Sequence, residues 1–316
     1  MFKTNTSLLL TLLLMPLLNF AQYTDQINSN RPGETMSAFS VGKSVIQLET
    51  GAYGISQKHH LLNYVANGYG IDATLRYGML MEKLEVIADI QYQSQVYEAL
   101  YTKTNQKALK QTILGAKYLL YDPFKNHEKK INVYSWNANR KFSWRQLIPA
   151  VSVFAGANFT SANNPYHFSP NAGISPKVIL ITQNHLGDGT WVFVTNTIAD
   201  YIGTEYPSYG YAVTLTKGFN DKWSGFVENQ GYKSDFYSDA IVRAGAAFLI
   251  TNDLQIDASA STSLKNTPSI FYGGLGFSWR YDDNYNEVRM PVEDPNVLKA
   301  QKRAKKGTKK KKFLIF

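Results

Sequence analysis

Acidic and basic residues occur at alternate positions within stretches that are otherwise apolar or small. Glu85 and Asp89, for example, alternate with Leu84, Val86 and Ala88. Side chains of both signs on one face form ion pairs, and a wet interior lined by them could also carry a small solute. Both interpretations stay open for Glu49, Arg76, Glu85, Asp89, Lys117, Glu228, Arg243, Asp257 and Arg280.

Catalytic motifs are missing from the sequence. None of the five histidines lies in a Gly-x-Ser-x-Gly or His-Glu-x-x-His pattern, and there is no cysteine for a nucleophile, a thiolate metal site or a disulfide. His59 and His60 fall in an expected outer loop, where an acid-base or metal role is the alternative to ordinary surface residues. We expect no enzyme, no metal and no cofactor.

Strand-like segments of about ten residues would position the charges. In the stretch Val45 to Gly54, Ile46 and Leu48 would share one face while Gln47 and Glu49 share the other. Such alternation indicates a strand between two different solvents. About twelve segments show it, near 45–54, 71–78, 84–93, 114–120, 148–159, 174–184, 190–202, 208–218, 223–233, 239–250, 254–264 and 271–281.

The expected connections alternate in length. Even-numbered ones are short and rich in turn residues, such as Asn220–Asp221 and Asn252–Asp253, whereas 56–68, 99–109 and 159–173 are longer. Outer-membrane barrels have short periplasmic turns, so both termini would be periplasmic. The exception, 122–147, is long enough for an extra hairpin or a short helix.

No apolar stretch after the N-terminal region is long enough for a membrane helix, which leaves a closed barrel as the membrane-spanning possibility. A secreted β-sandwich is the alternative, since its strands would alternate too. The inward charges and the small residues Ala244, Ala246, Ala258 and Ala260 favour a lipid-facing barrel of about twelve strands.

The N-terminus resembles an export signal. Lys3 precedes the apolar run Leu8–Leu18, and cleavage near Ala21 is expected, with a retained interfacial anchor as the alternative. The predicted organisation is a signal peptide (1–21), a periplasmic or plug segment (22–43), a β-barrel (44–282) and a basic periplasmic tail (283–316).

The net charge of +9 matches the nine basic residues of 299–316. In an exported chain this tail is not expected to bind nucleic acid. It would instead contact anionic envelope partners, either lipid headgroups or an acidic protein. The contact residues would be Lys309, Lys310, Lys311 and Lys312.

Ahead of the first strand stand Arg31, Pro32, Gly33 and Glu34. One interpretation is a plug that folds into the barrel mouth or lumen, with Arg31 paired to a lumen carboxylate such as Glu49 or Glu85. The other is a periplasmic lead-in with a turn at Pro32–Gly33. Only the arginine demands a partner, because the turn needs no more than the proline and the glycine.

The stretch Asn30–Ser37, followed by Val41–Lys43 and Gln47–Gly51, resembles the opening of the transporter family labelled MetA-pathway of phenol degradation. The resemblance extends over about residues 28–281. It implies an outer-membrane β-barrel that passes small, often apolar or aromatic compounds. Later similarities are Leu75–Gly78, Leu84–Glu85, Gly115–Lys117, Ile148–Ala150 and Glu228.

The sequence therefore predicts a β-barrel in the outer membrane of a Gram-negative bacterium, surrounded by lipid and passing a small solute passively. The alternative is an accessory barrel that does not transport and that scaffolds a larger envelope complex through 122–147 and the tail.

Overall fold

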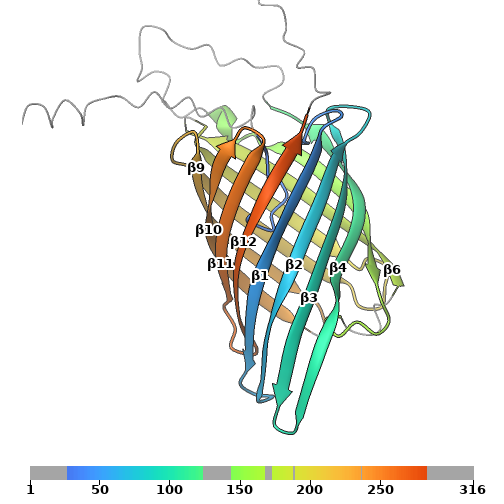
Figure 1. Ribbon diagram of the computed structural model, residues 1–316. Helices are drawn as coiled ribbons and strands as arrows, with labels where there is room; N and C mark the ends of the chain where they lie inside the picture. Colours follow the sequence, from blue (N-terminus) through green and yellow to red (C-terminus); the bar gives the residue numbers. More distant parts are fainter. Residues whose placement is uncertain (1–26, 124–143, 168–172, 188, 236, 283–316) are drawn as a thin grey trace, which may run out of the picture. The chain divides into compact units, whose positions relative to one another are not determined.

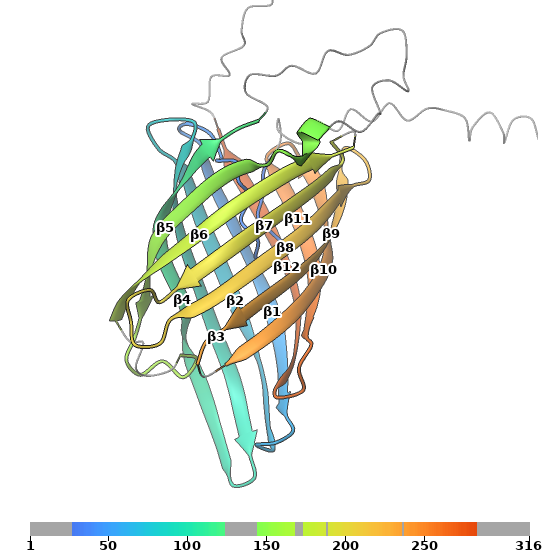
Figure 2. The same cartoon turned by 180° about the vertical axis from the view of Figure 1, so that it is seen from behind.

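The computed structural model describes residues 27–123, 144–167, 173–187, 189–235 and 237–282. Twelve antiparallel strands, each bonded to its neighbours in sequence, close into a barrel (Figures 1 and 2). The predicted fold class is confirmed. In chain order the elements are β1 (Ile46–His59), β2 (Tyr64–Gly78), β3 (Leu84–Ala99), β4 (Thr102–Tyr121), the 3-10 turn η1 (Trp144–Leu147), β5 (Ala150–Thr160), β6 (Gly173–Leu186), β7 (Trp191–Asp200), β8 (Ser208–Gly218), β9 (Trp223–Lys233), β10 (Ser238–Thr251), β11 (Leu254–Ser263) and β12 (Ser269–Tyr281).

Closure is made by β1 and β12, which pair from Ile46 opposite Tyr281 to Lys58 opposite Ser269. This seam is nearly as long as the β1–β2 pairing, which runs from Ile46 to His59. The barrel therefore has no free edge here, and the backbone groups along the seam are paired within the wall.

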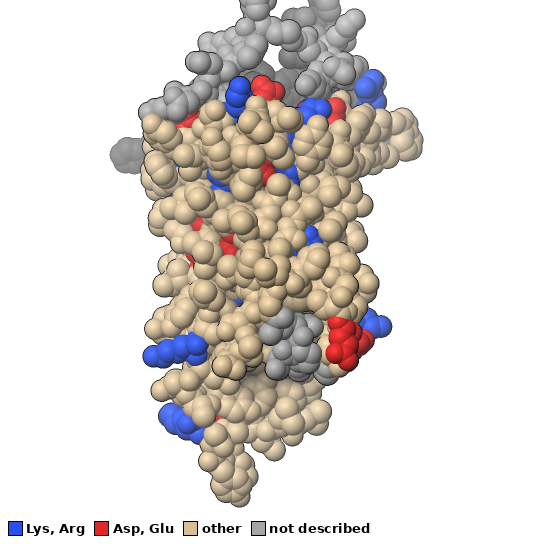
Figure 3. Space-filling view, turned by 90° about the vertical axis from the view of Figure 1, so that its right-hand side faces the viewer, with Lys and Arg blue, Asp and Glu red and all other residues tan. Residues whose placement is uncertain are grey.

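The two faces of each strand meet different surroundings. On β12 the outward residues Phe271, Leu275 and Trp279 are exposed, whereas the inward Ser278 is fully buried. On the face shown in Figure 3, charged side chains gather mainly toward the two ends and the middle is mostly uncharged. An apolar outward band of this kind suits lipid.

No helix within the described ranges combines the length and the apolar character needed to cross a membrane.

Two expected loops are wrong. β1 runs to His59 and β2 starts at Tyr64, and β3 and β4 are separated by only two residues, so most of 56–68 and 99–109 is strand. These hairpins project beyond the other strands at the lower end of Figure 1. Outside a membrane both faces of a strand meet water, so the apolar alternation that reveals a strand stops while the hydrogen-bonded ladder continues.

The N-terminal part of the described chain, here called the inner segment (residues 27–45), lies inside the barrel. Its two ends are held at the end of the barrel with the even-numbered connections, which we call the periplasmic end. The amide of Ile27 donates to the carbonyl of Asn252 at 3.0 Å, and that of Ser44 donates to Gly78 at 2.8 Å. Between them Ala38 is fully buried.

Some predictions fall outside the described residues. These are the signal peptide (1–21), most of the 122–147 connection, and the tail (283–316) with Lys309, Lys310, Lys311 and Lys312.

Candidate functional site

The inner segment is bonded to the wall all the way round the barrel. On β7, the amide group of Asn196 faces the backbone nitrogen and carbonyl of Met36 at 2.6 and 3.0 Å. The segment therefore crosses the lumen as a partition. Within the described ranges, hydrogen bonds or ion pairs join it to the other eleven strands, through Glu49, Asp72, Glu85, Lys117, Ser152, Gln183, Thr214, Glu228, Arg243, Asp257 and Ser278.

Four of the predicted lumen charges form one buried cluster on β1–β4. Arg76 lies 3.0 Å from Glu49 and 3.1 Å from Glu85, and Lys117 lies 2.7 Å from Glu85. All four side chains are at most 2% exposed. Two cations and two carboxylates balance, which is the condition under which buried charges are tolerated.

The same cluster holds the inner segment. Lys117 donates to the carbonyls of Ser37 and Phe39 at 2.7 and 2.9 Å, and Glu85 accepts the amide of Val41 at 2.8 Å. Arg76 donates to the carbonyl of Asn28 at 2.7 Å. The donors and acceptors of these side chains that do not take part in the ion pairs thus bond the backbone of the inner segment.

The guanidinium of Arg31 lies over Gly51 and Gly276. These glycines are in the next inward-facing row after Glu49, further from the periplasmic end. Gly51 is registered opposite Asp72 on β2 and Gly276 on β12, and Gly276 is registered opposite Asp257 on β11. A Cβ atom at either glycine would overlap the guanidinium of Arg31. The row Asp72–Gly51–Gly276–Asp257 therefore forms a flat bay, called the glycine bay below, with a carboxylate at each end.

Both carboxylates of the glycine bay pair with Arg31, at 3.3 Å for Asp257. Burial alone would lower the pKa of Arg31, but Asp72 and Asp257 raise it above its ordinary value. The guanidinium therefore stays charged in the lumen.

Arg31 pairs with lumen carboxylates, as the plug interpretation predicts, but these are Asp72 and Asp257 and not the suggested Glu49 or Glu85. The latter two carboxylates are already engaged by Arg76 and Lys117, which come from neighbouring strands. Glu49 contacts the inner segment through the backbone amide of Asn30, at 3.2 and 3.3 Å.

A third anchor is Glu228 on β9, which is 1% exposed. Its carboxylate accepts the backbone amides of Glu34 and Thr35 at 3.0 and 3.1 Å, and it pairs with Arg243. The hydroxyls of Thr35 and Thr214 add bonds of 2.7 and 2.9 Å. The half-exposed carboxylate of Glu34 lies 3.5 Å from Arg243.

The remaining predicted residues lie apart from these clusters. Asp89 accepts a hydrogen bond from Thr74 at 3.0 Å and another from Gln111. Arg280, near the end of β12, lies 3.4 Å from Asp282.

Apolar contacts hold the second part of the inner segment. Ala38 belongs to a buried cluster with Ile87, Phe154 and Ile181, and Met36 and Phe39 pack against it. This apolar core inside the lumen was not predicted, because the inward positions that the alternation identified were charged, polar or small.

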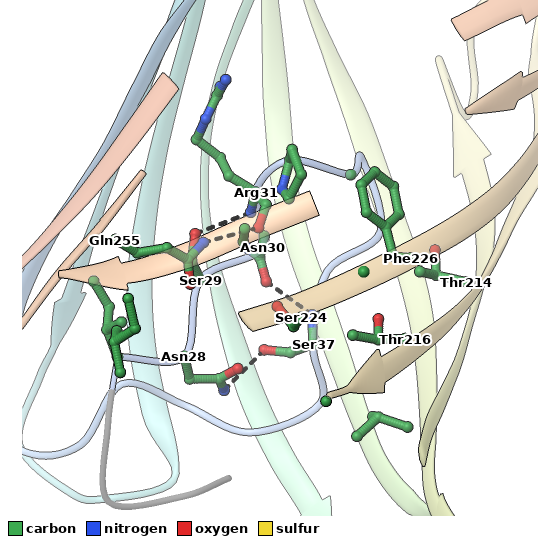
Figure 4. Close-up of a pocket in the computed structure, with 18 of the residues that line it drawn as sticks. Asn28, Ser29, Asn30, Arg31, Ser37, Thr214, Thr216, Ser224, Phe226 and Gln255 are labelled. Atoms are coloured by element: carbon green, nitrogen blue, oxygen red, sulfur yellow. Dashed lines mark hydrogen bonds between the residues drawn. The ribbon is translucent and has the colours of Figure 1, made fainter. Parts of the chain in front are cut away.

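A cavity of about 440 Å³ separates the first part of the inner segment from the wall (Figure 4). Polar groups such as Thr214, Thr216 and Gln255 alternate along it with Val192 and Phe226. The turn at 220–222 forms its edge, so the cavity lies toward the periplasmic end. No sequence pattern signalled it, because its lining comes from the inner segment and six strands.

The lumen also contains tyrosines that were not predicted. The rings of Tyr53 and Tyr272 meet edge to face with centroids 5.9 Å apart, and the ammonium of Lys110 lies 5.5 Å from the Tyr272 centroid. Tyr53 donates to the side-chain carbonyl of Gln93 at 3.1 Å. Because Lys110 is on β4 and Tyr272 on β12, this contact passes over the three strands between them.

Two of the described histidines form hydrogen bonds to groups near them. His59 accepts the amide of Leu62 at 3.1 Å, and His167 lies 3.0 Å from the hydroxyl of Tyr201. No three His, Asp or Glu residues of the described ranges are grouped to hold a metal ion.

The chain is similar to a known protein family and to several solved structures. The model of the family described as "Putative MetA-pathway of phenol degradation" matches residues 29–281. Among curated proteins, none matches this sequence.

Similar solved structures include the COG4313 outer membrane channel from Pseudomonas putida F1, with 12% identity and a TM-score of 0.48 over 80% of this chain and 100% of that one. The translocator domain of the autotransporter NalP from Neisseria meningitidis has 9% identity and a TM-score of 0.43, over 76% and 89% of the two chains. The CymD monoaromatic hydrocarbon channel has 11% identity and a TM-score of 0.41, over 75% and 88%.

Proposed function

Because the chain belongs to the family described for the MetA pathway of phenol degradation, we propose that it is an outer-membrane barrel through which a small solute passes without chemical conversion. The solute would be at least partly apolar and, following the family's description, aromatic. The inner segment (residues 27–45) would act as a plug.

One observation carries this proposal: the lumen is crossed by a segment that continues into β1 at one end and is held to the other strands by non-covalent contacts. Lys117, Glu85 and Glu228 form hydrogen bonds from the wall to the backbone of the inner segment. A lumen that was simply a packed core would not need so many bonds of this kind. Hydrogen bonds to the backbone can be exchanged for bonds to water at a modest net cost where water enters the lumen, as it can from the cavity beside residues 28–35. A plug can therefore shift without breaking the barrel.

The experiment is single-channel conductance in a planar bilayer, with purified protein that shows heat-modifiable migration on a gel. The intact chain is compared with a variant that lacks residues 22–43. Discrete steps that grow when the segment is deleted are the expected result, because the deletion removes the partition from the lumen.

A flux assay in liposomes then tests the solute class, using benzyl alcohol as a neutral aromatic probe and sucrose as a polar one. Faster entry of benzyl alcohol than through protein-free vesicles would support solute passage. No conductance and no flux with or without residues 22–43 would overturn the proposal and favour the accessory-barrel alternative.

Partners beyond solute and lipid belong to the same set of proposals. Contact of the tail with an anionic lipid surface or an acidic envelope protein is tested by deleting 299–316. Unchanged membrane retention and unchanged co-purifying proteins at low salt would contradict it.

A further inference from the structure

We propose that the cavity beside the inner segment is a binding site for neutral, partly apolar molecules on the periplasmic side of the plug. The inference rests on the proposed passage function and deepens it, because it assigns a place and a chemical class to the solute. The site borders two of the charged residues that anchor the inner segment, Arg31 and Glu228.

The size of the cavity fits a small molecule. Its volume of about 440 Å³ lies within the ~300–1,000 Å³ usual for ligand pockets. It lies between residues 27–37 of the inner segment and strands β6–β11, and the turns at 220–222 and 252 form its periplasmic edge. A molecule held here has passed the plug but has not left the barrel.

The lining is amphipathic. Val192, Val194, Phe226 and Leu249 offer an apolar wall. Hydroxyl and amide groups offer hydrogen bonds beside it, from Thr190, Thr216, Ser224, Gln255 and Asn28. This combination suits a ring or short alkyl part that carries one or two hydrogen-bonding groups.

The charged groups at the cavity are already engaged. The guanidinium of Arg31 points away from Thr214 and Phe226 in Figure 4, toward its partners Asp72 and Asp257. Glu228 accepts two backbone amides in addition to its pair with Arg243.

The other charged residues of the lining, Asp221 and Lys222, are exposed on the turn at the edge and have opposite signs, and Lys217 donates to the lining hydroxyl of Thr190. A carboxylate in this cavity would lose its hydration without gaining a partner, which is costly. The site should therefore select neutral molecules over anions of the same size.

The absence of cysteine from the sequence makes a direct test available. In a Thr216→Cys variant, the rate of modification by a small thiol reagent is measured in detergent, with and without benzyl alcohol or benzoate. We expect benzyl alcohol to slow the modification about tenfold near saturation, and benzoate to leave the rate within about twofold at the same concentration. A Ser161→Cys variant, exposed on the β5–β6 connection, controls for direct effects on the reagent.

Two neighbouring alanines on β10 provide a matched pair of variants. Ala247 is buried and lines the cavity, whereas Ala246 faces outward toward lipid. Ala247→Trp should fill the cavity and weaken benzyl alcohol binding at least about tenfold, measured by ligand-detected NMR, and Ala246→Trp should not. Both variants are first checked for heat-modifiable migration.

Equal binding by both tryptophan variants, or equal protection by benzyl alcohol and benzoate, would overturn the assignment of this cavity. The passage function would survive that result if the protein without residues 22–43 still conducts. Conversely, selective binding without any conductance or flux would support the site and overturn passage.

Discussion

The two parts of the inner segment are held by different kinds of contact. Residues 28–35 are polar, border the cavity and reach the wall through Arg31 and the amides that bond Glu49 and Glu228. Residues 36–41 pack on an apolar cluster and on the buried charges around Lys117. The first part borders the cavity, from which water can replace its hydrogen bonds and the Arg31 ion pairs, whereas moving the second exposes apolar surface and takes the carbonyls of Ser37 and Phe39 away from the buried Lys117. Opening should therefore begin in residues 28–35.

The largest effect should come from fixing the first part. The hydroxyl oxygens of Thr35 and Thr214 lie 2.6 Å apart, so cysteines at both positions are close enough for a disulfide in a chain with no other cysteine. We expect the oxidised Thr35→Cys/Thr214→Cys variant to lose solute flux completely and to regain it on reduction. Liposome flux before and after reductant is the measurement.

The two single-cysteine variants are the controls, since each loses one hydroxyl bond without gaining a link. Flux that persists in the oxidised double variant would show that residues 28–35 do not need to move.

The second-largest effect should come from removing the buried ammonium of Lys117, which bonds the second part of the inner segment (residues 36–41). Lys117→Met removes the ammonium that donates to the carbonyls of Ser37 and Phe39 and that pairs with Glu85, so that one described ion pair of Glu85, with Arg76, is left. We expect a loss of about 3–5 kcal/mol in the free energy of unfolding. Urea unfolding in liposomes measures it.

Lys107→Met serves as its control, because Lys107 is exposed on the same strand and should change stability by less than about 0.5 kcal/mol. Equal losses of stability in the two variants would contradict the prediction that the buried Lys117 holds residues 36–41 in place.

A smaller effect is expected at the glycine bay. A Cβ on Gly276 would overlap the guanidinium of Arg31, so Gly276→Ala should displace the arginine and loosen residues 28–35 by about 1–3 kcal/mol. Open probability in the planar bilayer should rise.

Gly273→Ala on the same strand is the matched control, because the nearest atom to its Cβ, in Phe271, is 3.8 Å away. Combining Gly276→Ala with Arg31→Ala completes a double-mutant cycle. Additive effects would mean that Arg31 and Gly276 are not coupled.

The smallest effect concerns Glu34. Its side chain is 52% exposed and 3.5 Å from Arg243, while the backbone amide of the same residue bonds Glu228. Glu34→Gln keeps the backbone bond, so we expect a change of only about 0.2–1 kcal/mol in the closed-state preference, read from open probability. A larger change would show that residues 28–35 are held mainly by the side chain of Glu34 and not by its backbone amide.

Strand alternation made most of the fold predictable. On β10 and β12 the outward positions are apolar and the inward positions are polar or small. As predicted from the sequence, Arg243 faces inward and Trp279 faces outward. The ends of β1–β4 were not predictable, because the polar stretch 102–108 has no apolar face to reveal it. The family resemblance, read from Asn30–Ser37, is confirmed by the match over 29–281.

The partners of Arg31 were hidden for a different reason. Asp72 and Asp257 become neighbours of one guanidinium only when β12 closes on β1 and brings Gly51 opposite Gly276. Local periodicity identifies inward positions but not which of them share a row around the barrel. The cavity was hidden likewise, since it is lined by residues from 27 to 255.

The bond between Ser29 and Ser278 has a consequence for the order of assembly. It joins residues 249 positions apart, from a segment that precedes the first strand to the last strand of the wall. The inner segment, which is synthesised before the strands, can thus complete its contacts only when the final hairpin is in place. Contacts so distant in sequence form slowly, which makes enclosure of the segment and sealing of the sheet a single late event in folding.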